Sequence, residues 1–199
     1  MRSGAFFLLT TLGFLILWTQ PAVPLFPVCR PPASDYLANF PYFAQLQSSW
    51  CWAATGQMVM QFLGKSVQQC QQAADQTGLA CCGMPFPVGC DAGSWPLFEE
   101  YGFSYDMMAG KVLTEAQIKA QIHCSRKPIA HAYVYAQGVW DGHMVVAYGY
   151  SWDPVQHITF IEVYDPDWQQ APAIPYDEYA RGPATNSAPW RDYYNITKK

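Results

Sequence analysis

The chain is poor in charge. Only 13% of its 199 residues are Asp, Glu, Lys or Arg, the formal net charge is −4, and no basic run is longer than the terminal pair Lys198-Lys199. Binding to a nucleic-acid backbone needs concentrated Lys and Arg, so the composition argues against nucleic acid as a partner. Apolar residues make up 51% of the chain and aromatic residues 16%, which indicates a compact globular protein rather than a disordered one.

No apolar run reaches the length that is typical of a membrane span. The longest extends from Phe6 to Trp18, thirteen apolar or small residues, and is broken by residues 19–22. This length is typical of a signal peptide, so we expect residues 1–22 to be one, with cleavage near Ala22. The chain is then secreted or periplasmic, and it contacts a membrane only if this segment stays uncleaved as an anchor.

Sequence patterns typical of cofactor sites are also missing. The chain has no Cys-x-x-Cys pair, no His-Glu-x-x-His, no phosphate-binding loop and no dinucleotide-binding glycine pattern. Zinc ligation by the clustered Cys81, Cys82 and Cys90 is an alternative, but they lack paired spacing and export favours disulfides. We therefore expect no metal and no organic cofactor.

What the chain does contain is an odd number of cysteines. The seven are Cys29, Cys51, Cys70, Cys81, Cys82, Cys90 and Cys124. At least one thiol should be unpaired, while the other six can form three disulfides in an oxidising compartment. Six cysteines allow fifteen connectivities, of which only a bond between the neighbours Cys81 and Cys82 is disfavoured. We expect Cys51 to be the free thiol, because only it has the surroundings of a nucleophile.

Helical patterns occupy the first half of the chain and strand patterns the second. We expect helices over residues 52–63, 67–77, 94–101 and 115–124, the last one begun by the capping box Thr114-Glu115-Ala116-Gln117. Runs rich in Val, Ile, Tyr and Phe predict antiparallel strands over residues 128–136, 143–152, 157–165 and 190–196. Residues 78–93, with three cysteines, read as a loop tied by disulfides.

This order predicts an α+β fold in which a helical lobe carrying Cys51 packs against an antiparallel sheet. Residues 23–39 are rich in proline and form an extended lead-in. Residues 40–199 form one domain, which is long enough to bury a core.

The segment Trp50-Cys51-Trp52-Ala53-Ala54 carries the strongest chemical signal. It places a lone cysteine at the expected start of a buried helix, where free N–H groups and the helix dipole favour a thiolate. Cys51 is therefore the candidate nucleophile. The alternative is a buried or disulfide-bonded cysteine, against which stand the helix-start position, the flanking tryptophans and the odd cysteine count.

A cysteine nucleophile needs a base, and His143 is the candidate. It starts a predicted strand just after the turn Asp141-Gly142, at a sheet edge that can face the helix of Cys51. An imidazole there raises the thiolate fraction and, once protonated, can donate a proton to a leaving amine. The chain offers three rivals, His123, His131 and His157, none of which precedes a similar glycine-punctuated apolar run.

Two further side chains complete the predicted site. Asp165 ends the next strand and can accept the second N–H of His143, with Asp167 as the rival and an ordinary turn aspartate as the alternative. Gln45, six residues before Cys51, can donate its amide to a developing oxyanion, with Gln47 as the competitor.

Together these strings resemble the papain-like cysteine peptidases. The residues that carry the resemblance are Gln45, Trp50-Cys51-Trp52-Ala53-Ala54, Gly142-His143-Met144-Val145-Val146 and Tyr164-Asp165-Pro166. It covers residues 40–166 and looks closest to the exported bacterial branch that includes plant-pathogen avirulence peptidases and the bacteriocin-processing type. The resemblance implies a papain-like fold, and the family's thiol, imidazole, acid and glutamine correspond to Cys51, His143, Asp165 and Gln45.

The chain departs from that family in three ways. Asp165 stands where plant and lysosomal papains use asparagine, no long inhibitory segment precedes the domain, and the loop 78–93 is an elaboration.

The resemblance implies hydrolysis of amide bonds in protein or peptide substrates. Two alternatives remain open at this point. One is a cell-wall peptide amidase or acyl transferase that uses the same site. The other is a non-catalytic binding module stabilised by disulfides.

Overall fold

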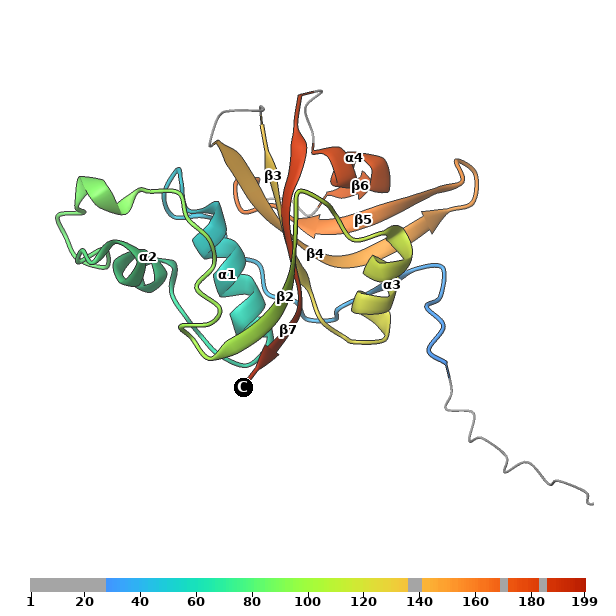
Figure 1. Cartoon of the computed structure of the whole chain (residues 1–199), viewed down its shortest axis with the longest axis horizontal. Coiled ribbons are helices and arrows are strands. Elements are labelled where there is room, and N and C mark those ends of the chain that lie inside the picture. Colours follow the sequence, from blue (N-terminus) through green and yellow to red (C-terminus); the bar gives the residue numbers. More distant parts are fainter. Residues whose placement is uncertain (1–27, 136–140, 169–171, 183–185) are drawn as a thin grey trace, which may run out of the picture.

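An antiparallel sheet forms the centre of the computed structural model, which describes residues 28–135, 141–168, 172–182 and 186–199 (Figure 1). The strands in this part of the chain are β1 (Asp35–Tyr36), β2 (Phe103–Ala109), β3 (Ile129–Val134), β4 (Gly142–Asp153), β5 (Ile158–Tyr164), β6 (Ala173–Pro175) and β7 (Ala188–Lys198). Their order is β2-β7-β3-β4-β5-β6, and β1 pairs with β4. The long β4 therefore pairs with three strands, β3, β5 and β1.

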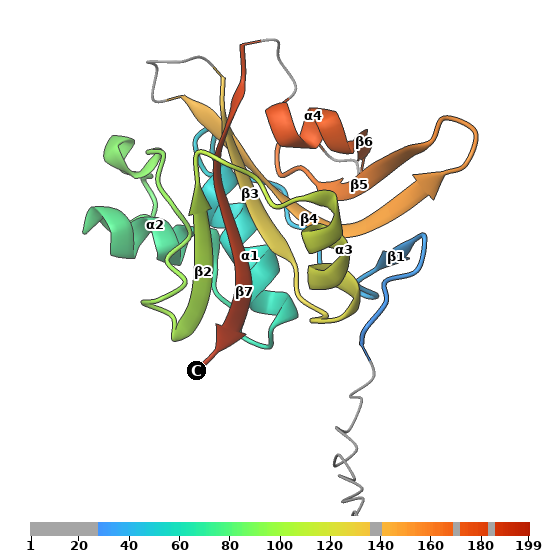
Figure 2. The same ribbon diagram turned by 45° about the vertical axis from the view of Figure 1, so that its right-hand side comes forward.

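Helices cover both sides of this sheet. They are α1 (Cys51–Phe62), α2 (Gln69–Thr77), α3 (Glu115–His123) and α4 (Tyr176–Arg181), with a 3-10 turn η1 (Val88–Cys90). α1 and α2 lie on one side, and α3 and α4 lie on the other (Figures 1 and 2). This confirms the predicted α+β fold, with a helical lobe carrying Cys51 against a sheet that carries His143 and leads into Asp165.

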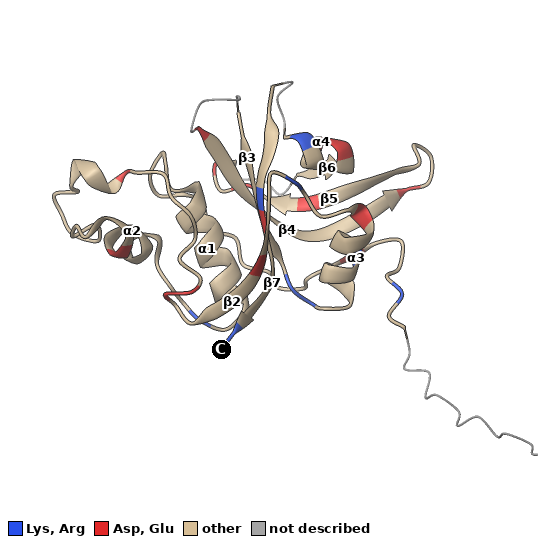
Figure 3. Ribbon diagram, viewed as in Figure 1, with Lys and Arg blue, Asp and Glu red and all other residues tan. Residues whose placement is uncertain are grey.

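α1 is the best-buried helix of the structure. Eight of its residues are buried, and it carries no charged side chain (Figure 3). It packs against β4 on one side and α2 on the other. Gly56 lies where α2 crosses, and a Cβ there would lie 2.4 Å from Gln72 Oε1, so the buried Gln72 side chain would have to shift. The predicted helix over residues 52–63 is confirmed, one residue displaced at each end.

α3 and most of the strands also lie where local sequence patterns predicted them. Thr114 accepts a hydrogen bond from the backbone of Gln117 and the Gln117 side chain reaches back, so the predicted capping box is confirmed. β3, β4, β5 and β7 occupy the four segments where strands were expected. β4 is buried along most of both faces, which explains its near-continuous apolar sequence.

Six elements differ from the sequence predictions. The helix expected over residues 94–101 is wrong: residues 92–97 are irregular and residues 98–102 form a turn, with a hydrogen bond of 2.8 Å from Phe103 N to Phe98 O. The short strand β1, the edge strands β2 and β6, the 3-10 turn η1 and the short helix α4 were not predicted.

Three disulfides join the described cysteines. They are Cys29–Cys124, Cys70–Cys82 and Cys81–Cys90, and Cys51 is free. The prediction of three bonds with Cys51 unpaired is confirmed, and all three cysteines that were considered as zinc ligands are in disulfides.

The first described residues are integrated into the fold. The Cys29–Cys124 bond ties them to the end of α3, β1 pairs with β4, and Leu37 is buried. The predicted signal peptide, residues 1–22, lies outside the described residues. Within the part of the chain that the structure describes, no helix is both long and apolar enough to span a membrane.

Candidate active site

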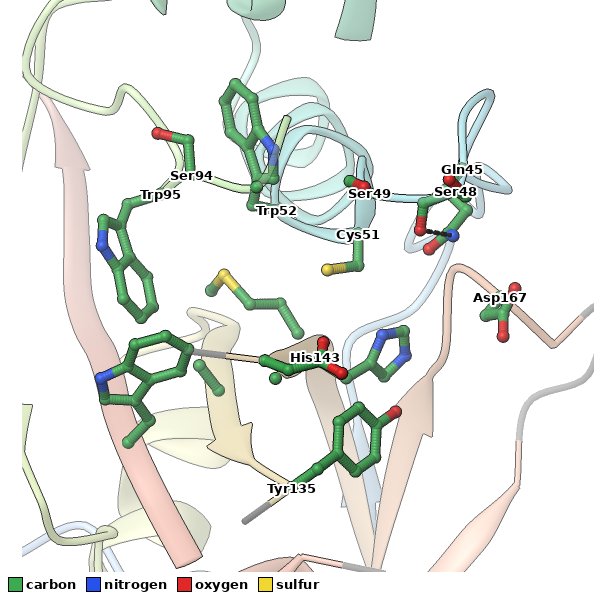
Figure 4. Close-up of a pocket in the computed structure, with 16 residues that line it drawn as sticks. Gln45, Ser48, Ser49, Cys51, Trp52, Ser94, Trp95, Tyr135, His143 and Asp167 are labelled. Atoms are coloured by element: carbon green, nitrogen blue, oxygen red, sulfur yellow. Dashed lines mark hydrogen bonds between the residues drawn. The ribbon is translucent and has the colours of Figure 1, made fainter. Parts of the chain in front are cut away.

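A pocket of ≈ 640 Å³ opens between the start of α1 and the adjoining ends of β3 and β4 (Figure 4). Gln45, Cys51 and His143 line it, so three of the four candidate residues meet in one cavity although they span about 100 residues of sequence. Trp52, Trp95 and Trp190 form apolar walls. The pocket is therefore framed by both lobes.

Cys51 is the first residue of α1. It is half-buried and unpaired, and no acidic residue occupies the first helical turn. The N-cap residue Trp50 makes no side-chain capping bond, so the N–H groups of the first turn remain available to an anion in the pocket. This is the geometry that the sequence predicted for a reactive thiol.

The two tryptophans beside Cys51 fix the start of the helix. Both are 1% exposed, and each donates its indole N–H to a backbone carbonyl of the disulfide-tied loop. Trp50 Nε1 lies 2.7 Å from Cys90 O, and Trp52 Nε1 lies 3.0 Å from Ala92 O. The loop that was expected only to elaborate the fold therefore holds the segment that carries the thiol.

His143 is the second residue of β4 and faces Cys51 across the pocket (Figure 4). Its Nε2 lies 2.6 Å from Asp165 Oδ1, and the side chains are 8% and 14% exposed. Asp165 follows β5 directly, and the pairing of β4 with β5 brings it beside His143. Since Asp165 occupies Nε2, the ring nitrogen left for the hydrogen bond with Cys51 is Nδ1.

These contacts control the protonation of His143. Burial alone would lower the pKa of the imidazole, because it disfavours the charged form. Hydrogen bonds to Asp165 and Cys51, together with the electrostatic interaction of the ring with both, outweigh burial and raise the pKa of His143 from 6.5 to about 10. At neutral pH the site therefore favours the protonated imidazolium form of His143.

Gln45 lines the pocket on the side of Cys51. Its Nε2 donates to Ser48 O at 2.9 Å, which leaves the second N–H of the amide free of that bond (Figure 4). Its Oε1 is buried without a hydrogen-bond partner among the described residues. The backbone N of Gln45 donates to Pro166 O at 2.9 Å, which links the glutamine to the turn that follows Asp165.

The rival residues have other surroundings. His123 Nδ1 pairs with Asp35 at 2.6 Å, His131 Nδ1 pairs with Asp192 at 2.7 Å, and His157 lies edge-on to Trp152. Asp167 lines the pocket, but its backbone N donates to Asp165 Oδ1 at 2.9 Å, so it supports the nearer carboxylate. Gln47 gives its backbone carbonyl to Trp50 N and is not among the lining residues.

Two supporting residues were not predicted from the sequence. Asp91 accepts from the Ser48 hydroxyl at 2.6 Å and from Ser49 N at 2.8 Å. The hydrogen bonds from Ser48 and Ser49 outweigh burial and lower the pKa of Asp91, which favours the ionised form of its carboxyl group. Tyr42 donates to the backbone carbonyl of Asp165, at 3.2 Å. No local pattern distinguishes either residue from an ordinary surface aspartate or core tyrosine.

No family model matches this sequence, and no curated protein matches it. Similarity is found among solved structures. A C39-like peptidase from Bacillus anthracis is 16% identical, with 83% of this chain and 99% of that chain covered at a TM-score of 0.53. The fold is papain-like.

Two other structures show a looser likeness. The peptidase domain of Streptococcus ComA, a bifunctional ABC transporter of a quorum-sensing pathway, is 11% identical, with 80% of this chain and 99% of that chain covered at a TM-score of 0.49. ProCathepsin B from Trypanosoma congolense is 13% identical, with 74% and 72% covered at a TM-score of 0.47. At 16% identity, the likeness to the Bacillus anthracis peptidase shows the fold and not the activity.

Proposed function

We propose that the protein is a cysteine peptidase that hydrolyses amide bonds of proteins or peptides. Cys51 is the nucleophile, His143 the general acid and base, Asp165 the residue that orients His143, and Gln45 an oxyanion donor. The observation that carries the proposal is the unpaired Cys51 at the mouth of α1, facing an imidazole whose other nitrogen is 2.6 Å from a carboxylate.

The reaction has two steps. The Cys51 thiolate attacks the substrate carbonyl, a carbon–sulfur bond forms, and the oxyanion is held by the Gln45 amide and the Cys51 backbone N–H. The carbon–nitrogen bond then breaks, and the leaving amine takes the proton of the His143 imidazolium. Neutral His143 next takes a proton from a water that attacks the thioester. The carbon–sulfur bond then breaks, which releases the carboxylic acid product and restores the Cys51 thiolate beside the His143 imidazolium.

A peptide derivative that carries an epoxysuccinyl group tests the site. Its epoxide should alkylate Cys51 and add one inhibitor mass, because the ring opens by attack of the thiolate and takes a proton from the site. Peptide mapping should find the adduct on Cys51, and Cys51→Ala should neither label nor cleave casein. An adduct on another residue, or casein cleavage by Cys51→Ala, would falsify the assignment.

The same preparation separates the proposal from its alternatives. Release of peptide stems from peptidoglycan without casein cleavage would favour a cell-wall amidase. Normal folding with an unreactive Cys51 would favour a binding module.

We also propose that the protein is exported, as in the exported bacterial branch that the sequence resembles. Three disulfides in a chain of this size support this, because such bonds persist in oxidising compartments.

A further inference from the structure

The buried side-chain amide of Gln69, on α2, makes hydrogen bonds to the backbone on both sides of Gln45. Gln69 Nε2 donates to Ala44 O at 2.8 Å, and Gln69 Oε1 accepts from Leu46 N at 2.9 Å. The side chain thus pairs with the peptide groups that flank Gln45 as a neighbouring strand would. These two bonds fix the position and the orientation of the loop from which the Gln45 side chain enters the pocket.

Gln69 is itself held rigidly. It is 2% exposed, and its Nε2 also lies 3.1 Å from Gln57 Oε1 on α1, so both donors and the acceptor of the amide are used. The next residue, Cys70, is fixed by its disulfide to Cys82. The hydrogen bonds of Gln69 therefore join the loop of Gln45 to α1 and α2 and, through Cys70, to a disulfide.

Gln45 needs such support because its own side chain is weakly held. The Gln45 amide makes one hydrogen bond, to Ser48 O, while its Oε1 has no partner among the described residues. A donor that acts on a developing oxyanion must be aligned before the reaction, since reorientation during the reaction forfeits its effect.

We propose that Gln69 is a positioning residue for the oxyanion donor Gln45. The inference rests on the proposed function, because it assigns Gln69 a role in that reaction. Gln69 touches neither the substrate nor the reacting atoms, and it acts through the backbone of Ala44 and Leu46.

Two reactions of Cys51 separate positioning from general damage. Hydrolysis of the p-nitrophenyl ester of N-benzyloxycarbonylglycine passes through an oxyanion, whereas attack of the thiolate on 2,2′-dipyridyl disulfide forms a mixed disulfide without one. Gln69→Met keeps the side-chain length and removes all its hydrogen bonds. It should lower kcat for the ester by about tenfold to a hundredfold, with KM and the dipyridyl disulfide rate within about twofold of wild type.

Gln72→Met is the matched control. Gln72 is also buried on α2 and donates to Ala53 O at 2.7 Å, but it does not contact the loop of Gln45. The control should lose folding stability as Gln69→Met does and keep kcat. Gln69→Glu, whose carboxyl in its protonated form retains an acceptor for Leu46 N and a donor for Ala44 O, should show a smaller loss of kcat and covers the case in which Gln69→Met does not fold.

Gln45→Ala completes the test. If Gln69 acts through Gln45, the double variant Gln45→Ala/Gln69→Met should be no slower than Gln45→Ala alone. Two results would overturn the inference and leave the proposed function standing. One is a loss of kcat in Gln45→Ala with a normal kcat in Gln69→Met. The other is a loss of kcat in Gln72→Met as large as that in Gln69→Met. A wild-type protein that reacts with the disulfide and does not turn over the ester overturns both.

Discussion

Among the individual residues, His143 joins the two halves of the chain. Its Nε2 contacts Asp165 from the strand side, and its Nδ1 is left for Cys51 from the helical side. Burial and the two neighbours act on the pKa of His143 in opposite directions, and the neighbours prevail. The pKa of His143 therefore depends on groups from both lobes.

Replacing Asp165 by asparagine should separate these contributions. Asp165→Asn keeps a hydrogen-bond acceptor and removes the charge, so burial weighs more and the pKa of His143 should fall from about 10. Activity requires the protonated imidazole, so its alkaline limit should move to lower pH by about one unit or more. The pH dependence of kcat/KM checks this shift. An alkaline limit that stays in place would mean that Asp165 does not control His143.

The residues of the site differ in how far the sequence could predict them. Cys51 and His143 lie in short segments with a recognisable local pattern. Cys51 is at the start of a helix, and His143 is at the start of a strand that follows a turn. Asp91 lies in a loop and Gln69 on a polar helix, and each accepts a hydrogen bond from a backbone N–H more than 20 residues away. Such bonds depend on where the chain crosses itself, which no short pattern records.

Among the elements, α1 shows how packing overrides helix propensity. Ala is favoured over Gly by about 1 kcal/mol inside a helix, so Gly56 should be a weak point of α1. Its hydrogen atom is instead needed where α2 crosses, with Gln72 Oε1 at 2.4 Å from a Cβ and Pro96 Cβ at 3.2 Å.

Gly56→Ala should therefore destabilise the protein by about 1–2 kcal/mol, since the clash costs more than the propensity gains. Urea unfolding with an unchanged m-value would measure this. Gln61→Ala, at an exposed position of the same helix, is the control and should stay within about 0.5 kcal/mol of wild type. A gain in stability for Gly56→Ala would show that α2 can move away.

The elements that were predicted share strong local signals, and those that were missed lack them. α3 has its capping box, and β4 has an apolar run buried on both faces. β2 lies at an edge with only one of its seven residues buried, so its sequence carries little strand pattern. In the wrongly predicted helix over residues 94–101, Trp95 packs from an irregular segment and Phe98 from a turn, and the spacing of these two side chains cannot be told from that of a helix.

In the whole molecule, residues 28–50 link the two lobes. This segment is tied to the end of α3 by the Cys29–Cys124 disulfide, pairs with β4 through β1, and then crosses to the helical lobe to reach α1 (Figure 2). On the way Tyr42 and Gln45 make hydrogen bonds to the turn at residues 165–168. This one continuous segment therefore contacts both the helical lobe and the turn that follows Asp165.

Two of the disulfides should rank in opposite order in their importance for folding stability and for the reactivity of Cys51. Cys29 and Cys124 are 95 residues apart, whereas Cys81 and Cys90 are 9 apart. Loop-closure entropy predicts a loss of about 4–5 kcal/mol when the first bond is removed and about 2–3 kcal/mol for the second. Only the second holds the carbonyls that bind the tryptophans beside Cys51.

We therefore expect Cys29→Ala/Cys124→Ala to unfold at lower urea while its Cys51 reacts with dipyridyl disulfide at the wild-type rate. Cys81→Ala/Cys90→Ala should lose less stability and react several-fold more slowly. Equal reactivity of the two double variants would show that the loop does not control the thiol.

The adjacency of Cys81 and Cys82 has a consequence for how the chain matures. Exchanging their partners gives Cys70–Cys81 and Cys82–Cys90, two bridges that span nearly the same short distances in sequence as the native ones. Loop closure hardly discriminates between the two pairings, so oxidative folding should pass through scrambled isomers that only thiol–disulfide shuffling corrects. Protein oxidised without a redox buffer or an isomerase should contain a fraction with every bridge closed and a Cys51 that reacts several-fold more slowly.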